Sequence, residues 1–146
     1  MVQDMDDDDQ AVSVYNNELM HYVSQVQDAM RLDQPECSAH CVSAICGSEV
    51  SIDLILDDQN NITDIGYEIS ACALTKTVMA IVLKHALGQN KHGIAQGLDS
   101  LNALLEHGTP AQGIWSELNI LDPARSYTAR HNSMRLPFEA ILKALI

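Results

Sequence analysis

Two of the four cysteines carry the most distinctive chemistry in this sequence. Cys46 is followed by Gly47, a residue type that permits backbone conformations barred to others and leaves the approach to the sulfur open. Cys72 lies in the stretch ISACALTK (residues 69–76), where an apolar, strand-like segment gives way to a helical pattern. A thiol in the first turn of a helix has a lowered pKa, because unpaired N–H groups and the helix dipole stabilise the thiolate. Both cysteines are therefore candidate sulfur nucleophiles, or ligands for zinc, copper(I) or iron–sulfur species.

An expected β-hairpin brings these two cysteines together. Apolar residues alternate with polar ones on both sides of the polar stretch DDQNN (residues 57–61), as in two antiparallel strands. If residues 57–61 form the whole loop, Ser48 faces Ser70, and Cys46 falls opposite Cys72 just beyond them. Facing Cα atoms in such a ladder lie about 4.5–5.5 Å apart. The pattern predicts two sulfur atoms within reach of one metal ion, whereas either cysteine alone would more commonly be a small buried side chain.

Further polar residues lie near these candidates. Two thiolates do not complete a tetrahedral metal shell, so more ligands are needed. Residues 123–135 carry three arginines and His131 but no acidic residue. Such local positive charge suits a site that holds anionic sulfur, and an ordinary arginine-bearing loop is the alternative. Cys37, His40 and Cys41 form a second small group, which we treat as secondary because a nearby proline argues against the helix that would align the two thiols.

Composition restricts the class of protein. The 20 acidic residues outnumber the 8 basic ones and give a net charge of −12, which would repel phosphate backbones, so neither nucleic acid nor a membrane is an expected partner. No secretory signal and no apolar run of about 18 residues is visible, so we expect a cytoplasmic protein whose cysteines are thiols or metal ligands. We expect an acidic disordered tail at residues 1–10 and a single domain at residues 11–146.

The remaining periodic segments predict helices. Apolar residues recur every three or four positions in segments 15–30, 74–85, 94–105 and 138–145. The first helix should end near Asp33, and Pro137 should lie in the first turn of the last one. A third strand is expected around residues 40–45, because an isolated hairpin is marginally stable. The sequence therefore predicts an α+β domain, with a small antiparallel sheet of about three strands packed against helices.

Three sequence blocks also carry a family resemblance. ICGSEVSIDLIL, ITDIGYEISACALTKT and ARHNSMRLPFEAIL, in this order and spacing, resemble the iron–sulfur cluster assembly scaffold family that includes IscU, SufU and the N-terminal domain of NifU. YNNELMHYV resembles the opening helix of that family, so the similarity spans roughly residues 15–145. The resemblance implies a SufE/NifU-like fold in which three cysteines and an aspartate hold zinc or a nascent cluster at one tip. Cys46 and Cys72 match the first and second of those cysteines.

The sequence departs from the family pattern at the other ligand positions. Ser48 stands where the family has its aspartate, and Ser133 stands where the third cysteine would precede the last helix. The chain thus resembles a divergent member that lacks the third cysteine, and His131 is the natural replacement ligand. Serine hydroxyls are much poorer ligands for soft metals than thiolates. We therefore expect Cys46, Cys72 and His131 to bind metal, with an outside ligand completing the shell.

The resemblance implies a function other than catalysis. We expect a scaffold-like protein, not an enzyme, that binds zinc, iron or a transient iron–sulfur cluster through its cysteines and passes it on. The implied partners are a cysteine desulfurase and apo iron–sulfur proteins, and the chain itself should be a monomer or weak homo-oligomer. Two alternatives stay open. One is a persulfide carrier that takes sulfur from the desulfurase, with Cys72 as the favoured acceptor; the other is a degenerate scaffold that acts as a regulatory or adaptor module.

Overall fold

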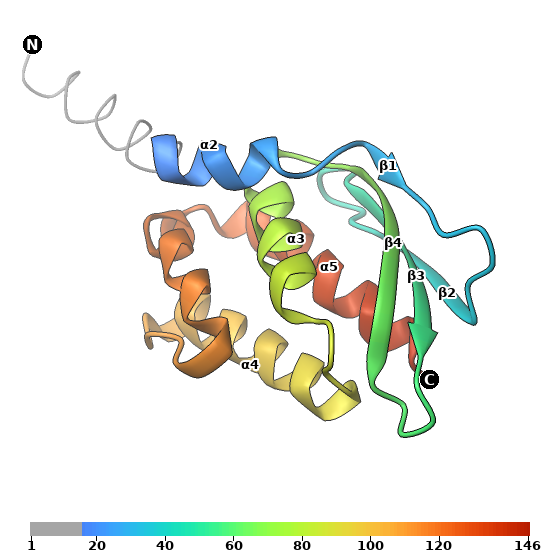
Figure 1. The fold of residues 1–146 in the computed structure, drawn as a ribbon. Coiled ribbons are helices and arrows are strands. Elements are labelled where there is room, and N and C mark those ends of the chain that lie inside the picture. Colours follow the sequence, from blue (N-terminus) through green and yellow to red (C-terminus); the bar gives the residue numbers. More distant parts are fainter. Residues whose placement is uncertain (1–15) are drawn as a thin grey trace, which may run out of the picture.

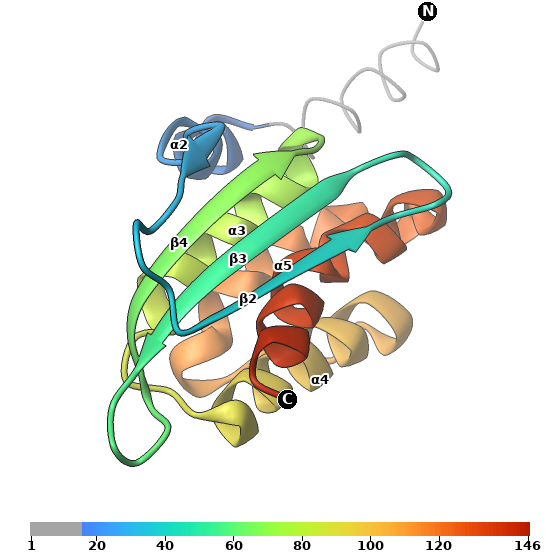
Figure 2. The ribbon, with the colours of Figure 1, turned by 90° about the vertical axis from the view of Figure 1, so that its right-hand side faces the viewer.

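The chain folds into two layers, a sheet and a group of helices. The computed structural model describes residues 16–146, so the expected acidic tail at residues 1–10 lies outside the described part. The helices cover one face of the sheet, as Figure 2 shows with the strands in front of them. Figure 1 shows the same two layers from the side. The predicted α+β class is confirmed.

The sheet is antiparallel and has four strands, where about three were expected. The strands are β1 (Ala29–Met30), β2 (Cys37–Val42), β3 (Glu49–Leu56) and β4 (Ile62–Ser70). Their order in the sheet is β1-β4-β3-β2. The additional strand β1 is short and pairs with β4 at one edge. The strand expected around residues 40–45 is β2, which begins earlier in the chain and pairs with β3 along its length.

The β3–β4 hairpin corrects the predicted register. The rung next to the loop forms as predicted, but a bulge follows it and shifts all later pairs by one residue. Ser70 therefore faces Glu49 rather than Ser48. Because β3 begins at Glu49, Cys46 lies in the turn before the strand, and the ladder does not pair it with Cys72.

Four α-helices and two 3₁₀ segments form the helical layer of the described chain. They are α2 (Asn17–Ser24), α3 (Ala73–His85), α4 (Lys91–His107), η1 (Gly113–Ser126), η2 (Thr128–Arg130) and α5 (His131–Ala144). α3 and α4 match the periodic segments. No helix of residues 16–146 has the length and apolar character that crossing a membrane requires.

Two helix boundaries differ from the prediction. α2 ends well before Asp33, because the chain turns and enters β1, which contains the last residue of the apolar stripe, Met30. α5 begins at His131, so Pro137 lies inside the helix rather than in its first turn. The missing N–H of Pro137 leaves the carbonyl of Ser133, four residues earlier, without its usual intrahelical donor.

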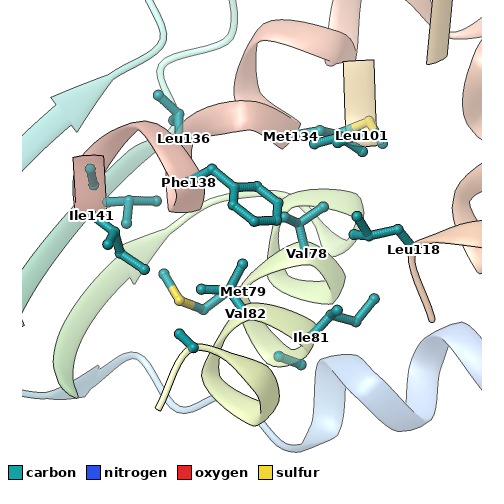
Figure 3. Packing of buried hydrophobic residues seen from close by; sticks show 14 of the residues in the cluster. Val78, Met79, Ile81, Val82, Leu101, Leu118, Met134, Leu136, Phe138 and Ile141 are labelled. Carbon is teal, nitrogen blue, oxygen red and sulfur yellow. The ribbon is translucent and has the colours of Figure 1, made fainter. Parts of the chain in front are cut away.

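The core fixes α5 against α3. Figure 3 shows the ring of Phe138 of α5 beside Val78 of α3. Both residues are fully buried, as is Met79 of α3. Trp115 of η1 packs edge-on against Phe138, with ring centroids 5.2 Å apart. Gly97 of α4 permits this approach, because a Cβ there would lie 2.4 Å from the Phe138 ring. These contacts fix α3 and α5 relative to each other, and with them the first turns of both helices.

A buried carboxylate holds the segment after β1 against the sheet. Asp53 of β3 is 0 % exposed. The Arg31 guanidinium donates two hydrogen bonds to it, at 2.7 and 2.9 Å. The backbone N–H of Leu32 and the hydroxyl of Ser38 donate two more, at 3.1 and 2.6 Å. The bonds from Arg31 are the main cause that lowers the pKa of Asp53 to about 2. We call this group the Asp53 clamp.

Candidate thiol site at the first turns of α3 and α5

Cys46 is presented by the tight turn between β2 and β3. Ser43 and Ser48 close this turn through a backbone hydrogen bond from Ser43 N–H to the Ser48 carbonyl, 2.8 Å long. Gly47 adopts a φ of 73°, a left-handed conformation that favours glycine, and its N–H donates to the Ser43 carbonyl. The turn leaves the Cys46 side chain exposed at the end of the sheet.

Hydroxyl groups surround the Cys46 sulfur. Its Sγ lies 3.5 Å from the Ser43 Oγ and 3.3 Å from the Ser48 Oγ. Hydrogen bonding with Ser43 is the largest cause that lowers the pKa of Cys46 to about 6, followed by bonds with Ser48 and a smaller contribution from Ser133. A thiol with that pKa is mainly thiolate at neutral pH. Cys46 is therefore an exposed sulfur anion.

Cys72 occupies the N-cap position of α3 and is half-buried. Its Sγ lies 3.6 Å from the Thr75 Oγ1. Burial opposes ionisation of this thiol, but hydrogen bonds with the backbone and hydroxyl of Thr75, and with Arg130, outweigh it and lower the pKa of Cys72. The expected lowering of this pKa is thus present, although α3 begins at Ala73, so that Cys72 is its N-cap residue rather than a residue of its first turn.

Ser133 and Thr75 connect the two thiols. The Thr75 hydroxyl donates to the Ser133 Oγ over 3.1 Å, and both side chains are fully buried. Ser133 in turn donates to the Arg130 carbonyl and contributes to the lowered pKa of Cys46. The β2–β3 turn, the start of α3 and the start of α5 therefore meet at one place. Tertiary packing, rather than the strand ladder, brings Cys46 and Cys72 into one hydroxyl network.

The three expected metal ligands do not form one centre. Among residues 16–146, no group of three or more His, Cys, Asp or Glu side chains is arranged to hold a metal ion. His131 instead lines a hollow beside Leu105 and Arg125. The reason is helical geometry: positions two apart on a helix do not share a face, so when Ser133 faces the thiols, His131 faces elsewhere.

Several solved structures share this architecture. The chain is similar to the N-terminal part of a nitrogen-fixing NifU-like protein from Brucella abortus, with 26 % identity and a TM-score of 0.85 over 92 % of this chain and 94 % of that one. This chain has the NifU-like fold. It also matches a Fervidobacterium islandicum protein described as an iron–sulfur cluster assembly scaffold for the SUF system (16 % identity, TM-score 0.82, 92 % and 98 % covered). A hypothetical protein matches with 19 % identity and a TM-score of 0.72, over 89 % and 98 % of the two chains.

These structures confirm the resemblance to the IscU, SufU and NifU-like family that the sequence blocks carry. No family model and no curated protein matches the sequence of this chain. The likeness is therefore much clearer in three dimensions than in the amino-acid sequence.

The second cysteine group of this chain, Cys37 and Cys41 with His40, is not a shared site. Cys37 and Cys41 lie on one face of β2, four residues apart on a strand, which separates their Cα atoms by about 13 Å. Their side chains pack against the core, whereas His40 is exposed and bonds to Ser51 over 2.7 Å. Burial raises the pKa of Cys41. Two thiols so separated do not bind one metal ion.

Sequence reasoning missed two hydroxyl groups of the site. Ser43 belongs to a turn that no periodic pattern marks, so no sequence signal points to it. Thr75 carried a usable signal, because it stands three residues after Cys72, the position at which a side chain reaches back to an N-cap residue.

Proposed function

We propose that this NifU-like protein is an iron–sulfur assembly scaffold-like protein that holds iron, sulfide or a transient cluster on Cys46 and Cys72 and passes it on. The observation that carries the proposal is the joining of two thiols of lowered pKa through Thr75 and Ser133. Similarity to a NifU-like protein along nearly the whole chain supports it. The proposed partners are a cysteine desulfurase and apo iron–sulfur proteins.

Among residues 16–146, the thiol site offers two soft ligands, Cys46 and Cys72. Ser48 and Ser133 occupy places next to the thiols, and their neutral hydroxyls bind soft metals poorly. The remaining positions of a tetrahedral shell are therefore filled from outside, by a thiol in solution or by a side chain of the partner protein. A cargo held by two internal ligands is released when the external ones exchange, which suits transfer better than storage.

Anaerobic reconstitution with iron, sulfide and a small external thiol tests this proposal. We expect visible absorption from an iron–sulfur chromophore, and iron that co-elutes with the protein on a desalting column. Cys46→Ser and Cys72→Ser should each abolish both signals. The Cys37→Ser/Cys41→Ser double variant is the matched control and should retain them. Absence of the chromophore, together with absence of metal in protein purified without chelators, contradicts the proposal.

Ser133 offers a complementary test. A cysteine at this place would add a third thiolate to the network that Thr75 and Cys46 already join. We expect Ser133→Cys to retain iron through desalting without any external thiol, while the wild-type protein loses it. Equal loss from both proteins would show that the two thiols do not form a metal site.

A persulfide carrier is the second candidate function, and the exposure of Cys46 favours it. A thiolate at Cys46 attacks the outer sulfur of a donor persulfide, R–S–SH. The new S–S bond forms at Cys46, the donor S–S bond breaks, and the donor leaves as the thiolate RS⁻. Cys46 thereby carries –S–SH without any change in total oxidation state. The exposed Cys46, rather than the half-buried Cys72 favoured from the sequence, suits this attack.

Mass spectrometry separates the two candidates. After incubation with a cysteine desulfurase and cysteine, a carrier gains one sulfur atom on the peptide that contains Cys46, in the absence of iron. Cys46→Ser should remove this gain and Cys41→Ser should not. No mass gain on any cysteine peptide would exclude the carrier role while leaving the cluster proposal standing.

A further inference from the structure

A hollow with several polar groups in its lining lies beside the first turn of α5, away from the thiols. Its volume is about 570 Å³, and it is lined by Leu105, Glu106, Arg125, Ser126, Thr128 and His131. No cysteine lines it, and the proposed scaffold function does not use it. Most of its polar lining comes from the arginine-bearing stretch 123–135, which the sequence marks as locally positive in an acidic chain.

Arg125 is fixed at one wall of this hollow. Gly108 ends α4 with a φ of 70°, and a Cβ at this residue would lie 2.6 Å from the Arg125 guanidinium. The positive φ favours glycine at this turn, and the absence of a side chain leaves room for the guanidinium to lie against it. The ion pair of Arg125 with Asp122 is long, at 3.9 Å, and the arginine side chain is 42 % exposed. The guanidinium thus has donors available for a bound acceptor.

The carboxylate in the lining, that of Glu106, is paired with an arginine of the protein. Glu106 lies 3.4 Å from the Arg135 guanidinium. Arg135 is held in place by a hydrogen bond to Asn102, 2.5 Å long, and by another to Asn132. The negative charge of Glu106 is therefore offset on its own side of the hollow, and the other polar groups of the lining are able to donate.

His131 has a buried nitrogen without a partner. Its side chain is 8 % exposed, and within the described chain its Nε2 is buried and makes no hydrogen bond. Leaving such a group unsatisfied costs stability, and native proteins rarely tolerate it without a ligand, water or functional reason. The residue also begins α5, where the positive end of the helix dipole favours an anion.

We propose that this hollow binds a small oxyanion of the phosphate or carboxylate class. Its donors are the Arg125 guanidinium and the hydroxyls of Ser126 and Thr128, and the unpartnered Nε2 of His131 lies in a residue of the same lining. An oxyanion accepts several hydrogen bonds at once, which matches a lining that offers a guanidinium and two hydroxyls. His131 therefore belongs to an anion site of its own rather than to the metal-ligand set expected from the sequence.

Amide NMR spectra of the full chain test the proposal. The protein is titrated with inorganic phosphate, and separately with acetate, while sodium chloride keeps the ionic strength constant. We expect saturable shifts for residues 105–108 and 125–131, and the tighter of the two anions identifies the class. Arg125→Gln and His131→Phe should each weaken binding at least tenfold. His92→Gln, an exposed histidine of α4, is the matched control and should bind as the wild type does.

The outcomes separate this site from the thiol site. The Cys46→Ser/Cys72→Ser double variant should bind the anion normally, so failure of the scaffold proposal leaves this test unaffected. Shifts that do not saturate, or that chloride alone reproduces, overturn the anion site. So does equal affinity in Arg125→Gln and the control. If His131→Phe fails to fold, Thr128→Val provides the second arm, with a severalfold loss of affinity expected and an unchanged affinity contradicting the proposal.

Discussion

The Asp53 clamp and the thiol site each hold a negative charge on or beside β3, one with a cationic partner and the other with neutral hydroxyl groups. β3 carries Asp53 of the clamp, and Ser48 of the thiol site directly precedes the strand. Asp53 is fully buried and paired with the cationic Arg31. Cys46 is exposed, and the neutral hydroxyls of Ser43 and Ser48 stabilise its thiolate. The pKa values are lowered in both cases, to about 2 for the carboxyl and about 6 for the thiol.

The difference decides what each anion does. A carboxylate that an arginine neutralises in a buried place has no free charge left for a ligand, and its bonds hold two segments together. Hydroxyl donors lower a thiol pKa without cancelling the charge that results. Cys46 therefore keeps both its charge and an accessible sulfur. The Asp53 clamp stabilises the fold, whereas the exposed thiolate of Cys46 is able to react or to bind a ligand.

Removal of each anion should give the largest contrast between the two sites. Asp53→Ala leaves the donors of Arg31, Leu32 and Ser38 without their shared acceptor, and should lower the free energy of unfolding by about 2–4 kcal/mol. Cys46→Ser removes an exposed side chain and should change it by less than about 0.5 kcal/mol. Urea unfolding measures both. Similar losses of unfolding free energy in the two variants would show that Cys46, too, stabilises the fold.

The second largest effect is expected at acid pH, which should weaken the Asp53 clamp. Because folding lowers the pKa of Asp53, its stabilising contribution is complete above the pKa of the unfolded carboxyl and is lost as pH falls toward about 2. The contribution amounts to about 2 kcal/mol. The unfolding free energy of the wild type should therefore fall more steeply below about pH 4 than that of Asp53→Asn, which is the matched control. Parallel pH profiles would contradict the assignment.

The sequence indicated the local surroundings of the two cysteines but not how they come together. A strand that begins just after Cys46 and a helix that begins just after Cys72 were predictable, because strand alternation and a helix start are local signals. The bulge after the first rung was not, since alternation does not encode one extra residue, and it removed the predicted pairing of the cysteines in the ladder. The hydroxyls of Ser43 and Ser133 reach Cys46 only through tertiary packing.

The start of the last helix shows a related limit. Pro137 indicated a helix start near itself, whereas α5 begins at His131, and the true start decides which side of the helix each residue faces. On the observed helix Ser133 faces the thiols, and His131 lines the separate hollow. A site residue near a helix start is thus predicted poorly whenever the boundary itself is uncertain by a turn.

Thiol reactivity should separate Cys46 from Cys41, which lies five positions earlier in the chain. Hydroxyl donors lower the pKa of Cys46 to about 6, whereas burial raises that of Cys41. Iodoacetamide should therefore modify Cys46 about tenfold faster at pH 7, a difference reduced by the weaker nucleophilicity of a low-pKa thiolate. Peptide mass spectrometry over time measures both rates. The rate of Cys46 modification should rise as the pH passes through about 6. A rate that rises only above about pH 8 would contradict the ionisation of Cys46 at neutral pH.

The smallest expected effect comes from single hydroxyls, and it contrasts the two sites most directly. Ser43→Ala removes the largest cause of the lowered Cys46 pKa, so that pKa should rise by about half to one unit, the equivalent of one hydrogen bond. Alkylation of Cys46 at pH 6 should slow about threefold, with little change in stability. Ser38→Ala, which removes a hydroxyl donor to Asp53, should cost about 1 kcal/mol and leave the alkylation profile unchanged. If Ser43→Ala instead lowers the stability and leaves the alkylation rate unchanged, the hydroxyl of Ser43 holds the turn together rather than stabilising the Cys46 thiolate.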